Sequence, residues 1–207
     1  MIQEHTPPRV LPDRSSATDG DEKLRKGLRD LVWSLGRDLR PSPDHGSRGA
    51  QTETLLRLFL NALEVLQDRR GQADCQYQLG NAAFRRRDYT SAEVCYERGL
   101  ELMSHEGDQS GVARCCHQLG LVAQGYGDHD KALHWYCRAI EAATLLKDIA
   151  AVSQSAHQLG NIFCLQGGYS DAMTCYGVCL ELAEARGDPT GVARAYYQLA
   201  VVAEARG

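Results

Sequence analysis

The side chains of this chain that are best able to do chemistry are its eight cysteines and seven histidines. Cys175 and Cys179 are one helical turn apart and could supply half of a metal site. However, the sequence contains no Cys-x-x-Cys pair and no second half for such a site. Free cysteines also behave as small buried apolar residues. We therefore predict no metal, no cofactor and reduced thiols.

A cysteine and a histidine could also form a nucleophile and its general base. Cys116 and His117 are neighbours, which point about 100° apart on a helix. His157 and Cys164 are seven residues apart, about 10 Å along a helix, which is too far for the hydrogen bond that activates a thiol. The sequence also has no phosphate-binding loop and no Gly-x-Ser-x-Gly motif. We therefore predict no catalytic residues and no enzymatic activity.

These side chains lie within an internal repeat of 40 residues (118 − 78). Gln78-Leu79-Gly80 returns as Gln118-Leu119-Gly120, as Gln158-Leu159-Gly160 and, altered, as Gln198-Leu199-Ala200. Further columns keep this register without insertion or deletion: Ala92, Ala132 and Ala172; Tyr96, Tyr136 and Tyr176; Leu100, Ile140 and Leu180; Asp108, Asp148 and Asp188. A period of this length is typical of stacked helical hairpins.

Residues that break helices divide the chain into a tail, a first hairpin and a regular array. Residues 1–20 are polar and without periodicity, so we predict disorder there. Helices are expected over 21–39 and 51–67, with a loop over 41–49, and 21–70 is thus a degenerate first hairpin. The array, 71–207, contains units 71–110, 111–150 and 151–190 and an orphan first helix at 191–207.

Each unit is expected to contain two helices, over about 73–86 and 90–105 in the first copy. Gly107 and Gly187 stand where a left-handed residue ends the second helix. Lys147 occupies this column in the middle unit, which predicts a less tightly specified turn. The predicted N-caps of the second helices are hydroxyl or carboxylate side chains: Thr90 or Ser91, Asp128 or Asp130, and Ser170.

The two helices of a unit are expected to meet through small residues. Gly80 and Ala92 would let the helices approach closely, while Leu79 and Tyr96 fill the seam between them. A larger side chain at a small position would overpack it, at a cost of about 1–3 kcal/mol. A single hairpin cannot bury its apolar face, so neighbouring units must complete the core.

The repeat resembles the tetratricopeptide repeat family. Leu79-Gly80, Ala92, Tyr96 and the Ala139 column match its Leu-Gly, alanine, aromatic and alanine signature. The unit is longer than the family's usual one of about 34 residues and lacks the closing proline. It is similar to a 40-residue subclass found in bacterial arrays and in Pins/LGN-type adaptors. The resemblance implies an all-α, right-handed α-solenoid of antiparallel helical hairpins that binds proteins.

In this family the free face of each first helix lines a concave groove, so the resemblance implies that a peptide or a partner protein binds there. Amide side chains both donate and accept hydrogen bonds, so Asn81, Asn161 and the glutamine column could hold an extended peptide backbone. The alternative is that the glutamines cap neighbouring turns or are merely solvated. The predicted binding residues are Asp74, Tyr77, Gln78, Asn81, Phe84, Arg85, Arg114, His117, Gln118, Leu121, Gln124, Gln154, His157, Gln158, Asn161, Cys164, Arg194, Tyr197 and Gln198.

One column of this face holds Tyr77, His117, His157 and Tyr197. Packed helices are about 8–10 Å apart and zinc–nitrogen bonds are about 2 Å long, so the two histidines are not expected to share a metal. They could instead make binding sensitive to pH. The family members that bind chaperone C-termini carry lysine in this column. Because this chain has none there, chaperone-tail binding is not predicted.

Composition argues against nucleic-acid and membrane partners. The net charge is −4, and no basic face is evident beyond Arg85-Arg86-Arg87. No apolar run approaches the roughly 20 residues that span a bilayer, and residues 1–8 lack the apolar core of a secretory signal. We therefore predict a cytoplasmic protein.

The last predicted helix, 193–206, has no second helix after it. Its packing face, with Leu199, Val202 and Ala203, is expected to lack a partner within the chain. The chain would then be part of a longer array, or this edge would bind a second copy or another protein. Oligomerisation or scaffolding through this edge is one alternative function. The other, based on the resemblance alone, is the sensor arm of a larger signalling or regulatory protein.

Overall fold

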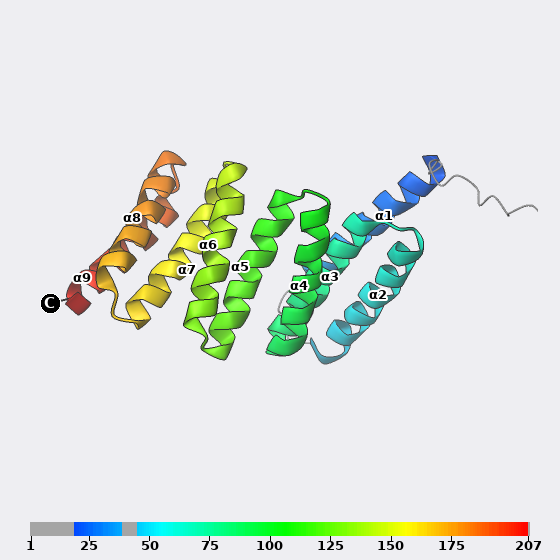
Figure 1. Ribbon diagram of the computed structural model, residues 1–207, viewed down its shortest axis with the longest axis horizontal. Coiled ribbons are helices and arrows are strands. Elements are labelled where there is room, and N and C mark those ends of the chain that lie inside the picture. The colour runs from blue at the N-terminus through cyan, green and yellow to red at the C-terminus, as the bar shows by residue number, and fades with distance from the viewer. Residues whose placement is uncertain (1–18, 39–44, 207) are drawn as a thin grey trace, which may run out of the picture.

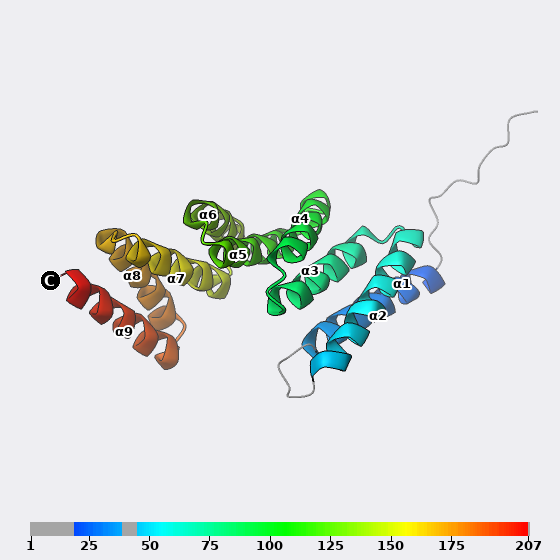
Figure 2. The same ribbon diagram turned by 90° about the horizontal axis from the view of Figure 1, so that it is seen from below.

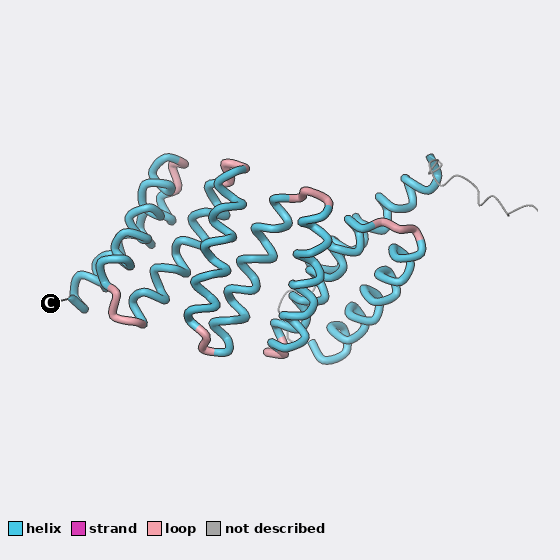
Figure 3. The backbone as a smooth tube through the Cα atoms, in the orientation of Figure 1, coloured by secondary structure: helices cyan, strands magenta, loops and turns pink. Residues whose placement is uncertain are grey.

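The computed structural model describes residues 19–38 and 45–206, which form nine α-helices and no strand. The helices are α1 (Asp19–Asp38), α2 (His45–Val65), α3 (Arg69–Arg85), α4 (Tyr89–His105), α5 (Gln109–Tyr126), α6 (His129–Leu145), α7 (Ile149–Leu165), α8 (Tyr169–Ala185) and α9 (Pro189–Arg206). Figures 1 and 2 show them stacked side by side along the long axis in two views at right angles, and Figure 3 shows how short the connections are. The predicted all-α solenoid of antiparallel hairpins is confirmed.

The first hairpin differs from its prediction at the expected loop. α2 begins at His45, so a loop over 41–49 is wrong for residues 45–49. Glycine costs a helix about 1 kcal/mol relative to alanine, but the packing of α2 against α3 outweighs this local preference. Residues 39–44 lie outside the described part of the chain. So does most of the predicted disordered tail, of which residues 19–20 belong to α1.

The turns from α2 onwards share one geometry and recur every 20 residues (87 − 67). In each turn one residue is left-handed, and the backbone N–H of the next residue bonds the carbonyl five residues before it, as from Asp108 to Met103 at 2.9 Å. The predicted left-handed Gly107 and Gly187 are confirmed. Lys147 adopts the same conformation with φ 56°, despite the steric cost for a residue with a Cβ. The left-handed residues are Gln67, Arg87, Gly107, Gly127, Lys147, Gly167 and Gly187.

The N-caps of most of these helices are aspartates that immediately follow the left-handed residue. Asp88 caps α4 by accepting a backbone N–H bond at 3.1 Å, so the prediction of Thr90 or Ser91 is wrong. The two hydroxyl residues lie inside the first turn of the helix. The prediction of Asp128 for α6 is confirmed, with a cap bond of 3.0 Å.

Helix α8 lacks such a cap, because Gly168 stands in the cap position and the expected Ser170 lies inside the helix. Gly168 has φ −79°, and a Cβ there would meet nothing closer than 3.5 Å. Gly168→Asp should therefore raise the free energy of unfolding by about 0.5–1 kcal/mol, through a new cap and a less flexible unfolded chain. Urea denaturation measures this. Gly167→Asp is the control: with φ 76° at that position it should destabilise, and a loss of stability in Gly168→Asp as well would contradict the capping role.

The core between the two helices of each unit is a tyrosine packed over a glycine. The three tyrosines are almost fully buried, and a Cβ on the facing glycine would come within 2.7 Å of the ring. The close approach predicted at Gly80 is confirmed. The pairs are Gly80 with Tyr96, Gly120 with Tyr136, and Gly160 with Tyr176.

Helix α1 is the first helix of the degenerate hairpin, and it packs on both α2 and α3. Leu35-Gly36 repeats Leu79-Gly80 at a spacing of 44 residues (79 − 35), four more than in the array. Val32 is fully buried in a cluster with Leu56 and Leu63 of α2. The same cluster includes residues of α3, so the first three helices share one core.

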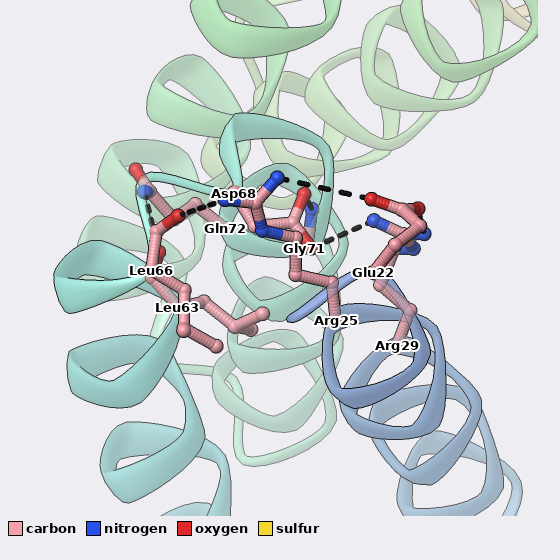
Figure 4. Close-up of polar contacts among 8 residues, drawn as sticks. All are labelled: Glu22, Arg25, Arg29, Leu63, Leu66, Asp68, Gly71 and Gln72. Atoms are coloured by element: carbon pink, nitrogen blue, oxygen red, sulfur yellow. Dashed lines mark hydrogen bonds and ion pairs between the residues drawn. The ribbon is translucent and has the colours of Figure 1, made fainter. Parts of the chain in front are cut away.

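Two arginines attach α1 to the turn between α2 and α3 (Figure 4). Arg29 Nη1 lies 2.7 Å from Asp68 Oδ2, and Arg25 donates to the Leu66 carbonyl at 3.0 Å. Asp68 is 6% exposed and also caps α3 by accepting from Gly71 N–H. Loss of Arg29 would leave this buried carboxylate without its cation, which costs more than the loss of an exposed ion pair.

Candidate functional site

The predicted binding residues lie on α3, α5, α7 and α9, but α1 covers three of those on α3. Asp74, Tyr77 and Gln78 are buried. Gly36 of α1 packs so closely on Gln78 that a Cβ at residue 36 would overlap the glutamine side chain. A partner cannot contact these three residues while α1 is in place.

Trp33 is the residue of α1 that makes the main contacts with this part of α3. Its indole donates a hydrogen bond to the Asp74 carboxylate, and its ring centre lies 6.0 Å from that of Tyr77. The Arg114 guanidinium of α5 lies 4.7 Å from the Trp33 ring centre and 5.1 Å from that of Tyr77. Burial raises the pKa of Asp74, an effect that Trp33 and Arg114 oppose. This space, lined by Asp74, Tyr77 and Arg114 and filled by Trp33, is here named the first seat.

Asn81 and Asn161, the asparagines predicted to line the groove, have partners within the protein. Each one accepts a hydrogen bond from a buried tyrosine and donates one to a glutamine of its own helix. The two chains of bonds are Tyr96–Asn81–Gln78, at 2.8 and 3.1 Å, and Tyr176–Asn161–Gln158, at 2.7 and 3.2 Å. The asparagines therefore orient the glutamines. In the third unit, which α1 does not cover, the bond from Asn161 occupies the side-chain oxygen of Gln158. The amide N–H groups of Gln158 remain available as hydrogen-bond donors.

His117 and His157, the histidines predicted to line the groove, pack against buried tyrosines. The ring centre of His117 lies 5.4 Å from that of Tyr136, and that of His157 lies 5.6 Å from that of Tyr176. His117 Nδ1 is also 3.0 Å from Ser155 Oγ on the next first helix. Burial lowers the pKa of both histidines, and the nearby Arg194 lowers the pKa of His157 further. Both imidazoles are therefore mainly neutral at pH 7.

These lowered pKa values predict that the fold loses stability in mild acid. The unfolded chain binds a proton at each histidine near pH 6.5, whereas the folded chain does so only at lower pH. Stability should thus fall as the pH drops from about 6.5 towards the folded-state pKa values. A His117→Gln/His157→Gln variant should show a smaller slope of unfolding free energy against pH in urea titrations. His105→Gln, at an exposed position, should keep the wild-type slope; equal slopes in all three proteins would refute the assignment.

A cavity of about 460 Å³ lies between α7 and α9, and we name it the open seat. It brings five predicted residues together from three first helices: His117, Gln154, His157, Gln158 and Arg194. Arg186 and Asp188, next to the turn between α8 and α9, also line it. The cavity thus combines amide, imidazole and guanidinium groups.

The other predicted residues of α3, α5, α7 and α9 do not line this cavity. Several have structural contacts: Gln124 accepts from Tyr136 at 2.6 Å, and Leu121 packs on a core cluster. Arg85 and Tyr197 are exposed, Tyr197 at 67%. The remaining ones are partly buried on the same helices: Phe84, Gln118, Cys164 and Gln198.

Trp33, Arg186 and Asp188 were missed by the sequence prediction. A signal for Trp33 exists, because Trp33-Ser34-Leu35-Gly36 parallels Tyr77-Gln78-Leu79-Gly80 once a spacing of 44 residues is allowed. This alignment places Trp33 in the aromatic column. Arg186 and Asp188 lie at the end of a second helix and in a turn, outside the faces that a helical wheel of the first helices compares.

The buried cysteines are poorly suited to nucleophilic chemistry. Burial raises the pKa of Cys75 and Cys115 to about 12 and that of Cys116 to about 11. At neutral pH these side chains are thiols, and the thiolate is the nucleophilic form. Within residues 19–38 and 45–206, no group of three or more His, Cys, Asp or Glu is placed to hold a metal ion.

The packing face of α9 has a partner within the chain. Val202 is 1% exposed and lies, with Leu199, in a cluster with Ala172 and Tyr176 of α8. The prediction that this face lacks a partner is therefore wrong for Leu199 and Val202, because this first helix also packs on the preceding second helix, whereas Ala203 is exposed. The large apolar side chains that α9 exposes are Tyr196, Tyr197 and Val201.

Comparisons with known proteins agree with this architecture. No helix in the described part of the chain is long and apolar enough to cross a membrane. No curated protein sequence matches the chain significantly. Residues 71–144, however, match the sequence model of the family described as tetratricopeptide repeat. The 40-residue subclass and the likeness to Pins/LGN-type adaptors stay predictions.

Solved structures share the fold at low sequence identity. BtubC (BKLC) from P. vanneervenii is 19% identical, with a TM-score of 0.74 over 91% of this chain and 82% of that one. Aspartyl phosphate phosphatase F from Bacillus subtilis is 12% identical, with a TM-score of 0.76 over 90% of this chain and 46% of its own length. A putative kinesin light chain with TPR-like repeats from Podosopora anserina is 12% identical, with a TM-score of 0.68 over 92% and 90% of the two chains. Residues 71–144 thus match the tetratricopeptide repeat family in sequence, and the described chain shares the α-solenoid fold of these solved structures.

Proposed function

We propose that this chain is a non-catalytic protein–protein interaction scaffold that binds a peptide or a partner protein in its concave groove. The open seat carries the proposal. It gathers hydrogen-bonding side chains from α5, α7 and α9 around a cavity of about 460 Å³, within the range of about 300–1,000 Å³ that is usual for ligand sites. Stacked repeats commonly use such extended concave surfaces for binding.

Two further observations support this proposal. The cysteines of the described residues are free thiols, which fits the reducing conditions of a cytoplasmic location. Gln158 is held by a bond from Asn161 of its own helix, and His117 lies 3.0 Å from Ser155 Oγ of the next first helix. Little side-chain entropy is therefore lost when a peptide binds these two residues.

Selection of peptides from a random phage-displayed library on the full chain tests the proposal. The affinity of the selected peptides would be measured by fluorescence anisotropy for the wild type and for a Gln118→Ala/Gln158→Ala variant. Loss of two hydrogen bonds should weaken binding by about tenfold or more. The matched control is Glu101→Ala/Glu181→Ala, at exposed positions of α4 and α8, which should leave the affinity unchanged.

Two outcomes would count against groove binding. Selected peptides could bind the glutamine variant as tightly as the wild type, or the control variant could weaken them equally. Circular dichroism of both variants before the measurement shows whether a loss of affinity reflects a loss of fold.

A further inference from the structure

The first seat and the open seat occupy the same place in units that are two repeats, or 80 residues, apart. The corresponding pairs are Asp74 and Gln154, Tyr77 and His157, and Arg114 and Arg194 (154 − 74). Each seat has an arginine from the following first helix, Arg114 of α5 in the first seat and Arg194 of α9 in the open seat. The first seat contains Trp33 and a carboxylate, whereas the open seat has an amide in place of that carboxylate.

The arginine of the open seat lacks the charge compensation found in the first seat. Asp74 is close enough to Arg114 for the guanidinium to oppose the rise in its pKa. Among the described residues, none of Arg114, Arg186 and Arg194 takes part in an ion pair, so the two seats differ in the acidic side chain near the arginine and not in a formed salt bridge. The acidic residue that lines the cavity is Asp188, whose Oδ1 already accepts the Gly191 N–H at 3.0 Å as a helix cap.

A second substitution increases the positive charge of the open seat. Arg186 stands where the first unit has Glu106 (186 − 106 = 80). Two guanidinium groups therefore line a cavity with one carboxylate. The equivalent positions of the first unit hold two arginines, Arg70 and Arg114, and three acids, Asp74, Glu106 and Asp108. The two seats thus differ in the sign of their net charge.

We propose that the open seat binds an acidic side chain of the partner peptide, with its carboxylate held by Arg194 and Arg186. The inference rests on the proposed function and specifies the ligand chemistry at one place in the groove. A guanidinium can hold a carboxylate through two parallel hydrogen bonds. The free amide N–H groups of Gln158 add a donor from α7.

This arrangement makes binding depend on the protonation of His157. The charged or titratable groups around it are His117 on α5, Tyr176 and Cys179 on α8, Arg186 and Asp188 at the following turn, and Arg194 on α9. Burial and the nearby Arg194 both disfavour the imidazolium of His157 in the free protein and so lower its pKa, whereas a bound carboxylate would favour it. Binding should therefore strengthen as the pH falls from about 7.5 towards 6.

Histidine NMR signals of the full chain test the seat without a selected peptide. The probes are N-acetyl-glutamate N-methylamide and its glutamine analogue at millimolar concentrations. The glutamate probe should shift the His157 ring signal and raise its pKa, and the glutamine analogue should not. Arg194→Glu should abolish the response, while Arg98→Glu, an equal charge change on α4, should preserve it. A response that is absent, or that survives in Arg194→Glu, would overturn the assignment.

The selected peptides provide the second measurement. Replacing each Asp or Glu of a groove-binding peptide by Asn or Gln should identify one position that weakens wild-type binding about tenfold, or about 1.4 kcal/mol. The same replacement should have little effect on binding to Arg194→Glu. Peptides that bind in the groove with no such position would refute the acidic preference and leave groove binding intact. Peptides insensitive to the glutamine variant would refute groove binding, whatever the NMR result.

Discussion

Replacing Gly120 by valine is expected to lower the free energy of unfolding by about 3 kcal/mol, the upper part of the range for an overpacked core. A Cβ at this position would lie 2.5 Å from the Tyr136 ring. The ring cannot easily move aside, because Tyr136 donates to Gln124 at 2.6 Å and packs against His117. For a chain of this size the midpoint of thermal unfolding should fall by roughly 6–12 °C.

Gly177→Val is the matched control for this substitution. Gly177 also lies within a helix, but a Cβ there meets nothing within 4 Å, so stability should change by no more than about 0.5 kcal/mol. A double-mutant cycle adds a second test, since Gly120→Val should cost less in a Tyr136→Leu background. Equal effects at both glycines would show that contact with the tyrosine is not the cause.

Trp33→Ala is expected to destabilise the chain by about 3 kcal/mol and to release α1 from α3. The substitution removes the indole that packs on Tyr77 and Arg114 and donates to the Asp74 carboxylate. Loss of a large aromatic side chain typically costs about 3–5 kcal/mol, and Trp33 is only partly buried, so the lower end applies. The carboxylate of Asp74 would also lose its indole donor, which adds to the cost.

Hydrogen exchange measured by mass spectrometry separates local release from global loss of stability. In Trp33→Ala, amides of α1 and of residues 69–85 should exchange faster, while those of α7 and α8 keep wild-type rates. Leu31→Ala on the same helix, at a position 49% exposed, should leave exchange unchanged. Wild-type exchange rates over α1 in Trp33→Ala would show that the indole does not hold the helix.

The regular part of the fold could be predicted because its main contacts recur at fixed spacings. Leu79-Gly80 and Tyr96 hold the same relation in later units, so one helical wheel describes the core of each. The caps of α4 and α8 were misplaced because hydroxyl residues inside the helix look like caps in sequence, whereas Asp88 makes the bond in α4 and Gly168 stands at the cap position of α8. The sequence predicted a first helix in place of α1, but not its position over α3. That position depends on the spacing from Leu35-Gly36 to Leu79-Gly80, which is four residues longer than the repeat of the array.

The sequence predicted which side of the first helices carries the candidate site, but not which residues of that side line the cavity. A helical wheel places His117, Gln154 and His157 on one side, but it cannot tell which side chains have partners elsewhere. The bonds from Tyr176 to Asn161 and from Asn161 to Gln158 depend on the distance between helices, which sequence spacing does not supply. The cavity itself also depends on side chains from α8 and the following turn, whose places are set by the packing of several helices.

The uniform turns have a consequence for how such a chain can change its length. Because the left-handed residues recur every 20 residues and the first and second helices alternate, removal of residues 111–150 would join Ser110 to Ala151 through an equivalent junction. Recombination between copies could thus add or delete whole units without inventing a new connection. The binding surface would then evolve by gain or loss of whole repeats. The number of repeats would set the distance between the first seat, which Trp33 fills, and the open seat beside Arg194.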